Sequence, residues 1–309
     1  MNAKKIIKTF SKKILYPFIN RYDKIIEEVE KNRILIARQY ISEQKRLTTL
    51  PDKLSDIEFQ VFSQWGEDGI IQFLISKVPI ENEIFIEFGV QDYSESNTRF
   101  LLMNDNWKGL IMDSSAEFIN KIRSSQIYWQ HDLTAVKAFI TKDNINDIIA
   151  SNNISGDIGI LSIDIDGNDY WIWDAISVVS PRIVICEYNS VFGCDRAITI
   201  PYKEDFERTK AHYSNLYFGA SLKALYGLAE KKGYNFVGSN KAGANAFFVR
   251  KDVARDLNAL DCKTGYVKSK SRESIDKAGR LTYVSGDERA KLIAGMKVYD
   301  VEKKLTTVI

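Results

Sequence analysis

Short apolar runs that end in an acid alternate with helical patterns through the middle of this chain. The first run, Ile84–Ile86, leads into Glu87, then Gly89 and a polar loop, and then a helical segment over Asn97–Met103. This order of strand, tight turn and helix is the first unit of a doubly wound α/β sheet. Ligands of such sheets bind at the carboxyl ends of the strands, so Glu87 stands where a nucleoside or an ammonium group would be held.

The same pattern predicts further strands at residues 109–114, 127–132, 158–164 and 183–187, with helical segments between them. Strands separated by helices are expected to be parallel. Each of these strands ends in an acid: Asp113, Asp132, Asp164 and Glu187. Together with the acid of the first strand, these side chains are expected to meet at one edge of the sheet. Crowded carboxylates repel one another, so they need a cation, a metal or hydroxyl donors beside them.

The later part of the chain predicts a lid, a helix and a hairpin. Residues 190–218 are irregular and rich in charges and aromatics, and they follow the fifth strand, so they are expected to cover the sheet's active edge. A helix over 219–232 and two strands over 234–240 and 244–250 come next, joined by a short turn that implies an antiparallel pair. The predicted organisation is an N-terminal helical arm (1–50), a domain (51–251) and an extension (252–309) that packs back on it.

The arm has two interpretations. Apolar residues at helical spacing alternate with lysines over Lys4–Phe18, and a second helical pattern over Ile25–Ile36 follows Pro17. A basic amphipathic helix can contact an anionic membrane face, here through residues 1–20. The alternative is a helix that packs on its own domain or on a partner subunit in a homo-oligomer. The glutamates of the second pattern cancel much of the positive charge and favour the alternative.

Composition narrows the class of protein. The 309 residues carry a formal net charge of +2, which speaks against a nucleic-acid partner. The three cysteines form no paired framework and no CxxC spacing, which favours a reducing, cytoplasmic compartment. The lysine-rich start lacks the apolar core of a signal peptide, and no stretch is long and apolar enough for a transmembrane span.

Several stretches together resemble a class I S-adenosylmethionine-dependent methyltransferase, and within that class the FkbM-like proteins. In order, they read FSQWGEDGII, FIEFGVQDYSESNTRFLL, GLIMDSS, HDLT, LSIDIDGNDYWIWDAI, IVICEYN, YFGASLKAL and KGYNFVGSNKAGANAFFVR. The resemblance covers about residues 60 to 250. It implies a Rossmann-like, mostly parallel seven-stranded sheet whose last two strands form an antiparallel hairpin. It departs from the family pattern in the glycine-rich loop, which keeps only Gly89.

The resemblance also implies a set of residues that bind S-adenosylmethionine. Glu87 and Gly89 would line its methionine end, Asp113 would hold the ribose hydroxyls, and Asp132 would approach the adenine. Asn97 and Thr98 would supply polar contacts in place of the missing glycines. The implied set also includes Gln64, Ser114, Leu133 and Asp164.

Catalytic and metal-binding roles are expected around DIDGND. Asp164 and Asp166 would lie beside the transferred methyl group, and His212, in the lid, is a candidate general base. Asp164, Glu187 and Asn189 resemble the ligand set of metal-dependent O-methyltransferases, and such oxygen ligands suit Mg²⁺. A metal-free hydrogen-bonded cluster is the alternative, as is a solvated loop histidine for His212.

The leading hypothesis is an O-methyltransferase acting on a sugar hydroxyl of a nucleotide-activated sugar or surface-polysaccharide precursor. One alternative is a sugar oxidoreductase or epimerase with a nucleotide cofactor, which is disfavoured because GxGxxG and a Tyr-x-x-x-Lys pair in a plausible place are missing. Another is a catalytically inactive methyltransferase-fold scaffold that works through residues 1–50.

Overall fold

The computed structural model describes the backbone of residues 3–46 and 50–309, and the side chains of residues 21, 24–46 and 50–309. By internal contacts the chain divides into two units, Met1–Arg46 and Leu47–Ile309. The first unit is helix α1 (Ala3–Lys45), which runs without a break through Pro17. The predicted membrane contact concerns residues 1–20, whose side chains lie outside the described ones. None of the described helices is both long and apolar enough to cross a bilayer.

The second unit contains a seven-stranded sheet with the strand order β3-β2-β1-β4-β5-β8-β7. The neighbours from β3 to β5 pair in parallel, β8 pairs antiparallel with β5, and β7 pairs antiparallel with β8. The predicted α/β class, with a mostly parallel sheet and an antiparallel C-terminal hairpin, is therefore confirmed. The strands are β1 (Ile84–Phe88), β2 (Lys108–Asp113), β3 (Leu133–Lys137), β4 (Gly156–Ile163), β5 (Val179–Glu187), β7 (Tyr234–Ser239) and β8 (Asn245–Arg250).

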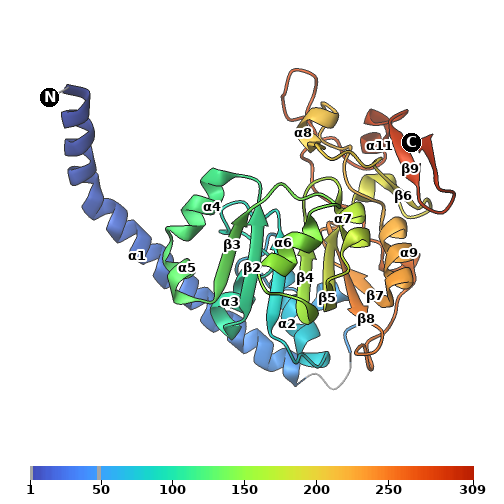
Figure 1. Cartoon of the computed structure of the whole chain (residues 1–309), viewed down its shortest axis with the longest axis horizontal. Helices are drawn as coiled ribbons and strands as arrows, with labels where there is room; N and C mark the ends of the chain where they lie inside the picture. The colour runs from blue at the N-terminus through green and yellow to red at the C-terminus, as the bar shows by residue number, and fades with distance from the viewer. Residues whose placement is uncertain (1–2, 47–49) are drawn as a thin grey trace. The chain divides into compact units, whose positions relative to one another are not determined.

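Helices cover both faces of this sheet (Figure 1). Helices α6 (Ile145–Ser151), α7 (Asp169–Ala175) and α9 (Leu222–Lys232) pack on one face, and α2 (Glu67–Lys77), α3 (Arg99–Asp105) and α4 (Ala116–Arg123) pack on the other. The central strands are buried along nearly their whole length, as expected for strands covered on both sides. The polar residues of these strands lie mostly at or near their ends, and Arg182 in the middle of β5 is an exception.

The prediction of a strand at residues 127–132 was wrong. Residues Gln126–Gln130 form helix α5, and the third strand, β3, begins only at Leu133. β3 is an edge strand, so only Leu133 and Ala135 of its side chains are buried, and it lacks the apolar run that marked the other strands. The more apolar segment before β3 belongs to helix α5, whose Trp129 is largely exposed.

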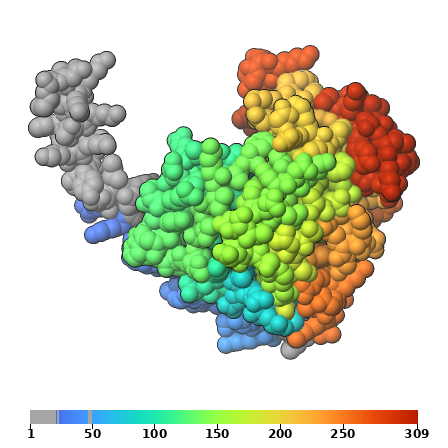
Figure 2. All heavy atoms as spheres, viewed as in Figure 1, coloured from blue at the N-terminus to red at the C-terminus, as the bar shows by residue number. Residues whose placement is uncertain are grey.

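The predicted lid and the C-terminal extension share a small core. β6 (Ile198–Thr199), β9 (Lys297–Asp300) and β10 (Leu305–Val308) form a three-stranded antiparallel sheet. Ile198 and Leu216 from the first segment pack with Ile293 and Val298 from the second, and Figure 2 shows the two segments together at one end of the domain. The short helices are η1 (Leu54–Ile57), η2 (Ser190–Phe192), α8 (Arg208–Ala211), α10 (Cys262–Gly265) and α11 (Glu288–Leu292).

Gly89 lets the loop after β1 pass directly over the end of β4. Its φ is +73°, and a Cβ atom there would lie 1.8 Å from the carbonyl oxygen of Asp164. Gly156 has nearly the same φ, +71°, but a Cβ atom on it would meet no atom within 4 Å. The two glycines therefore separate the effect of backbone conformation from that of close approach.

We expect Gly156→Ala to lower the free energy of unfolding by about 1–2 kcal/mol, from its left-handed backbone alone. Gly89→Ala should lower it by a further amount of about 1–3 kcal/mol, because two strand ends must move apart. Urea unfolding of both variants measures the difference. Equal losses would show that the two strand ends are not in close contact.

Candidate functional site

A cavity of about 450 Å³ lies at the carboxyl edge of the sheet. The register brings the ends of β1, β2, β4 and β5 level with one another. Phe88 of β1 pairs with Met112 of β2, Glu87 pairs with Ser162 of β4, and Ile163 of β4 pairs with Cys186 of β5. The loops that leave these strands form the cavity wall. The sequence-predicted residues that line it are Gln64, Glu87, Gly89, Asn97, Asp113, Ser114, Asp164, Asp166 and Glu187.

Glu87 organises the loop after β1. Its carboxylate accepts hydrogen bonds from the backbone N–H of Asn97 at 2.9 Å and of Thr98 at 3.1 Å, and from the hydroxyl groups of Ser96 and Thr98. Burial raises the pKa of Glu87, and these four donors oppose that rise. These four hydrogen bonds occupy about all the acceptor sites of a carboxylate, so this acid shapes the wall of the cavity more than it offers itself to a ligand.

Asp113, at the end of β2, is held in place but still has acceptor capacity. Its Oδ2 accepts from the backbone N–H of Gln91 at 2.9 Å, and its Oδ1 accepts from that of Ser115 at 2.7 Å. A carboxylate oxygen can accept more than one hydrogen bond, so both oxygens can also accept from a ligand in the cavity. This arrangement suits a pair of neighbouring hydroxyl groups.

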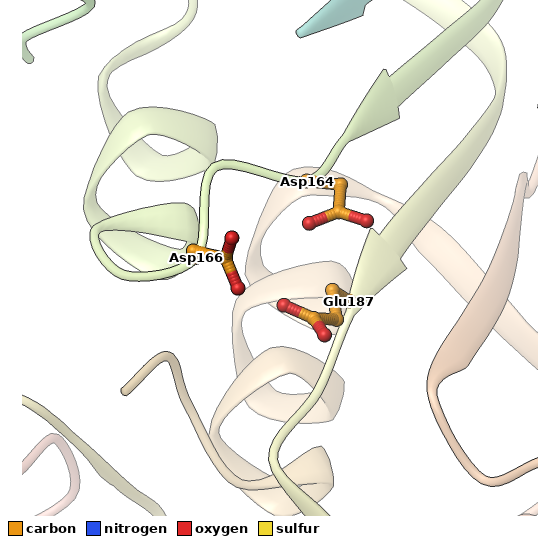
Figure 3. Close-up of side chains that lie close together, drawn as sticks. All are labelled: Asp164, Asp166 and Glu187. Carbon is orange, nitrogen blue, oxygen red and sulfur yellow. The ribbon is translucent and has the colours of Figure 1, made fainter. Parts of the chain in front are cut away.

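Asp164, Asp166 and Glu187 form an acidic cluster, in which one oxygen from each residue lies within 4.8 Å of the others. Figure 3 shows Asp164 after β4, Glu187 at the end of β5 and Asp166 in the loop before α7, with their carboxyl groups turned toward one another. Asp166 has a left-handed backbone, with φ +55°, as an active-site turn often has. Burial, and then the repulsion of the neighbouring acids, raises the pKa of both Asp164 and Glu187 well above the ordinary range.

Arg208 from α8 faces this cluster. Its Nη1 lies 2.6 Å from Asp166, and its Nη2 lies 2.6 Å from Glu273 of the C-terminal extension. Its guanidinium also lies 3.8 Å from the centre of the Phe218 ring. Among the described residues that line the cavity, eight carry a carboxyl group and Arg208 alone carries a cationic side chain. The cavity is therefore strongly anionic.

Asp132 and Leu133 do not reach the cavity. β3 runs parallel to β2, with Leu133 opposite Gly109 and Lys137 opposite Asp113. Asp132 therefore lies before the amino end of its strand, at the opposite edge from the other acids. The expectation that five strand-end acids converge is corrected to four, because the third strand begins after Asp132.

Three other candidates serve the structure around the cavity. Thr98 is fully buried and hydrogen-bonds to Glu87. Asn189 donates its Nδ2 to the carbonyl oxygens of residues 216 and 218 and accepts from residue 191, so it is not part of the acidic cluster. His212 lies outside the residues that line the cavity, and its Nδ1 lies 2.8 Å from Ser214 Oγ. Burial lowers the pKa of His212.

Several residues that line the cavity were not among those that the sequence predicted. Asn168 and Asn245 are almost fully buried, and the Oδ1 atom of each lacks a hydrogen-bond partner among the described residues. The position of Asn168 within DIDGND is a local signal that could have found it. Phe206 packs where a Cβ atom on Gly167 would lie, which explains the glycine of that motif. Arg208 carries no local signal, because only tertiary structure brings it to the acids.

Asp68 shapes the wall that carries Gln64. Its Oδ2 accepts from the backbone N–H groups of residues 61, 62 and 63 at 2.7–2.9 Å and from Ser63 Oγ at 3.0 Å. Its Oδ1 is buried and lacks a hydrogen-bond partner among the described residues. Burial raises the pKa of Asp68 from 3.8 to about 6.

This pKa predicts a pH dependence of stability. Between about pH 4 and pH 6 the folded state holds a proton on Asp68 that the unfolded chain has released, so its contribution to stability is lost as the pH rises through this window. A rise from 3.8 to about 6 corresponds to about 3 kcal/mol. Urea unfolding of wild type and Asp68→Asn at about pH 4 and pH 7 measures it. The wild type should lose about 3 kcal/mol relative to the variant, and a constant difference would contradict the assignment.

Comparison with models of known protein families found no match, and comparison with curated protein sequences found none. Solved structures that resemble the chain in fold include methyltransferases and a protein domain with SAH bound. The N-terminal domain of EvdMO1 with SAH bound has a TM-score of 0.40 and 10% identity, over 69% of this chain and 94% of that chain. The plantazolicin methyltransferase BamL, in complex with a desmethyl analogue and SAH, has a TM-score of 0.39 and 15% identity, over 74% and 99%. A methyltransferase from Clostridium acetobutylicum ATCC 824 has a TM-score of 0.39 and 9% identity, over 60% and 90%.

Proposed function

We propose that this chain is an S-adenosylmethionine-dependent O-methyltransferase that acts on a sugar hydroxyl of a glycan precursor. The observation that carries the proposal is the anionic cavity at the carboxyl edge of a doubly wound sheet, with a fixed carboxylate at the end of β2. The strand order changes direction at β1 and β4, and nucleoside ligands of open α/β sheets bind at such a point.

The residues present fit this cofactor. Asp113 would accept the two ribose hydroxyls, and its bonds to backbone N–H groups keep it in place for that purpose. Gly89 lets the backbone approach a ligand closely, and Glu87 fixes the loop that follows. Phe139, exposed at the cavity beyond the end of β3, offers a ring for the adenine. When bound, S-adenosylmethionine supplies a methyl group on a positively charged sulfur, which suits an anionic cavity.

The acceptor would lie in a second chamber of about 380 Å³ that adjoins the first. Aromatic Phe139 and Phe206 line it together with polar Asn215, whose Oδ1 lacks a hydrogen-bond partner among the described residues. Aromatic rings beside polar groups match the apolar ring faces and hydroxyl groups of a sugar. A neutral sugar fits the anionic lining, whereas the acids would repel the diphosphate of a nucleotide-linked sugar.

The raised pKa values of Asp164 and Glu187 suit proton transfer. Burial and the neighbouring acids raise the pKa of both groups, which makes each carboxylate, once ionised, a stronger base than an ordinary one. Either residue could accept the proton of the acceptor hydroxyl as the methyl group is transferred. The protein's further contribution would be to hold acceptor and cofactor in line.

Cofactor binding is tested by calorimetry with S-adenosylhomocysteine. Asp113→Ala should weaken binding at least about tenfold, because a hydrogen bond to a charged group contributes about 1.5–3 kcal/mol. Asp132→Ala is the matched control, since this exposed acid lies at the opposite edge of the sheet. The absence of binding by the wild type, or equal effects of the two substitutions, would refute the proposal.

Acceptor chemistry is tested by incubating the protein with S-adenosylmethionine and a panel of neutral and nucleotide-linked sugars, with mass spectrometry as the readout. We expect methylated hydroxyl groups, with neutral sugars preferred. Glu187→Gln should reduce turnover by about 10²–10⁴-fold if this residue acts as the general base. Transfer to amines alone would exclude the sugar hydroxyl as the acceptor.

A further inference from the structure

We propose that Asp164, Asp166, Glu187 and Asn245 form a binding site for one divalent cation. The three carboxyl groups come from two neighbouring strand ends and the loop before α7, and they lie close enough to share one ion. Asn245 contributes an amide oxygen from a third strand. The sequence suggested Asn189 as the amide ligand, but the side chain of Asn189 is occupied by backbone groups.

The orientation of Asn245 is the observation that points to a ligand. Its Nδ2 donates to Glu67 Oε1 at 2.8 Å, and a carboxylate can only accept, so the amide nitrogen must face Glu67. The amide oxygen is then left for the cavity, which Asn245 lines. This oxygen is buried, lacks a hydrogen-bond partner among the described residues, and belongs to a side chain that is only 6% exposed. A buried acceptor without a donor is costly, and a cation would satisfy it.

Asn245 lies beside the acids. It is the direct partner of Glu187 in the antiparallel ladder of β5 and β8, and such partners project from the same face of the sheet. Glu187 Oε2 is likewise buried and lacks a hydrogen-bond partner among the described residues. Two oxygen atoms from paired residues on adjacent strands are therefore both without a hydrogen-bond partner among the described residues.

The charge balance fits a divalent ion. When all three carboxyl groups are ionised, as they would be around a cation, they carry −3, and Arg208, which bonds to Asp166, supplies +1 and leaves about −2. Part of that arginine's charge is also shared with Glu273. A set of carboxylate and amide oxygens suits Mg²⁺ or Mn²⁺, which would complete their coordination with water or with hydroxyl groups of an acceptor. In that last role the inference rests on the proposed function, because the ion would lower the pKa of the hydroxyl to be methylated.

The test measures metal binding alone, without cofactor or acceptor. Electron paramagnetic resonance counts the Mn²⁺ bound to the full chain, and calorimetry with Mg²⁺ follows competition for the site. We expect one Mn²⁺ per chain, displaced by Mg²⁺. Asp164→Asn and Glu187→Gln should each weaken binding at least about tenfold. Asn245→Ala should also weaken Mn²⁺ binding. An unchanged affinity in that variant would show that the amide of Asn245 is not a ligand.

Asp113→Asn is the matched control, since it removes an acid that lines the same cavity outside the cluster. It should leave the Mn²⁺ affinity unchanged while it weakens S-adenosylhomocysteine binding. Thermal unfolding confirms that each variant is folded; the Asp164 and Glu187 variants should be at least as stable as wild type, because each removes a repelling charge. If wild type binds no Mn²⁺, or if all acid substitutions weaken binding equally, the metal site is refuted, while cofactor binding stands or falls by its own measurement.

Discussion

Repulsion among carboxyl groups is the constraint on which this structure depends. The fold brings acids from the ends of β1, β2, β4 and β5 to one cavity, where burial makes each negative charge costly. The groups that surround each acid differ. Glu87 receives four hydrogen-bond donors and Asp113 receives two. Asp164 and Glu187 have raised pKa values and face Arg208.

These differences separate acids that build the cavity from acids that can act in it. A carboxylate whose oxygens already accept several hydrogen bonds has little left to offer, and Glu87 is such a group. Asp113 keeps acceptor capacity while its position is fixed, which is what recognition of a ligand's hydroxyl groups requires. Burial and neighbouring acids raise the pKa of Asp164 and Glu187, and the proposed proton transfer and cation binding rest on these two residues.

The lid and the C-terminal extension contribute side chains to the cavity from parts of the chain far from the central strands. Arg208 belongs to the first segment and Glu273 to the second, and they meet at the acidic cluster through a pair of short contacts. A small apolar core shared by Ile198, Ile293 and Val298 holds the two segments together. The cavity's only cationic side chain among the described residues thus depends on packing that lies outside the main sheet.

The sequence alone determined the main architecture. Strands that are buried on both faces have continuous apolar sequences, and the hairpin has two such sequences joined by a short turn. It also located Asp113, Asp164 and Glu187, since residues at strand ends follow from the strands themselves. It misplaced Asp132, because an edge strand needs few apolar residues and leaves a weak pattern. Only the tertiary structure brought Arg208, Glu273 and Asn245 to these acids: contacts between residues far apart in the chain are set by the packing of whole elements, which no local pattern records.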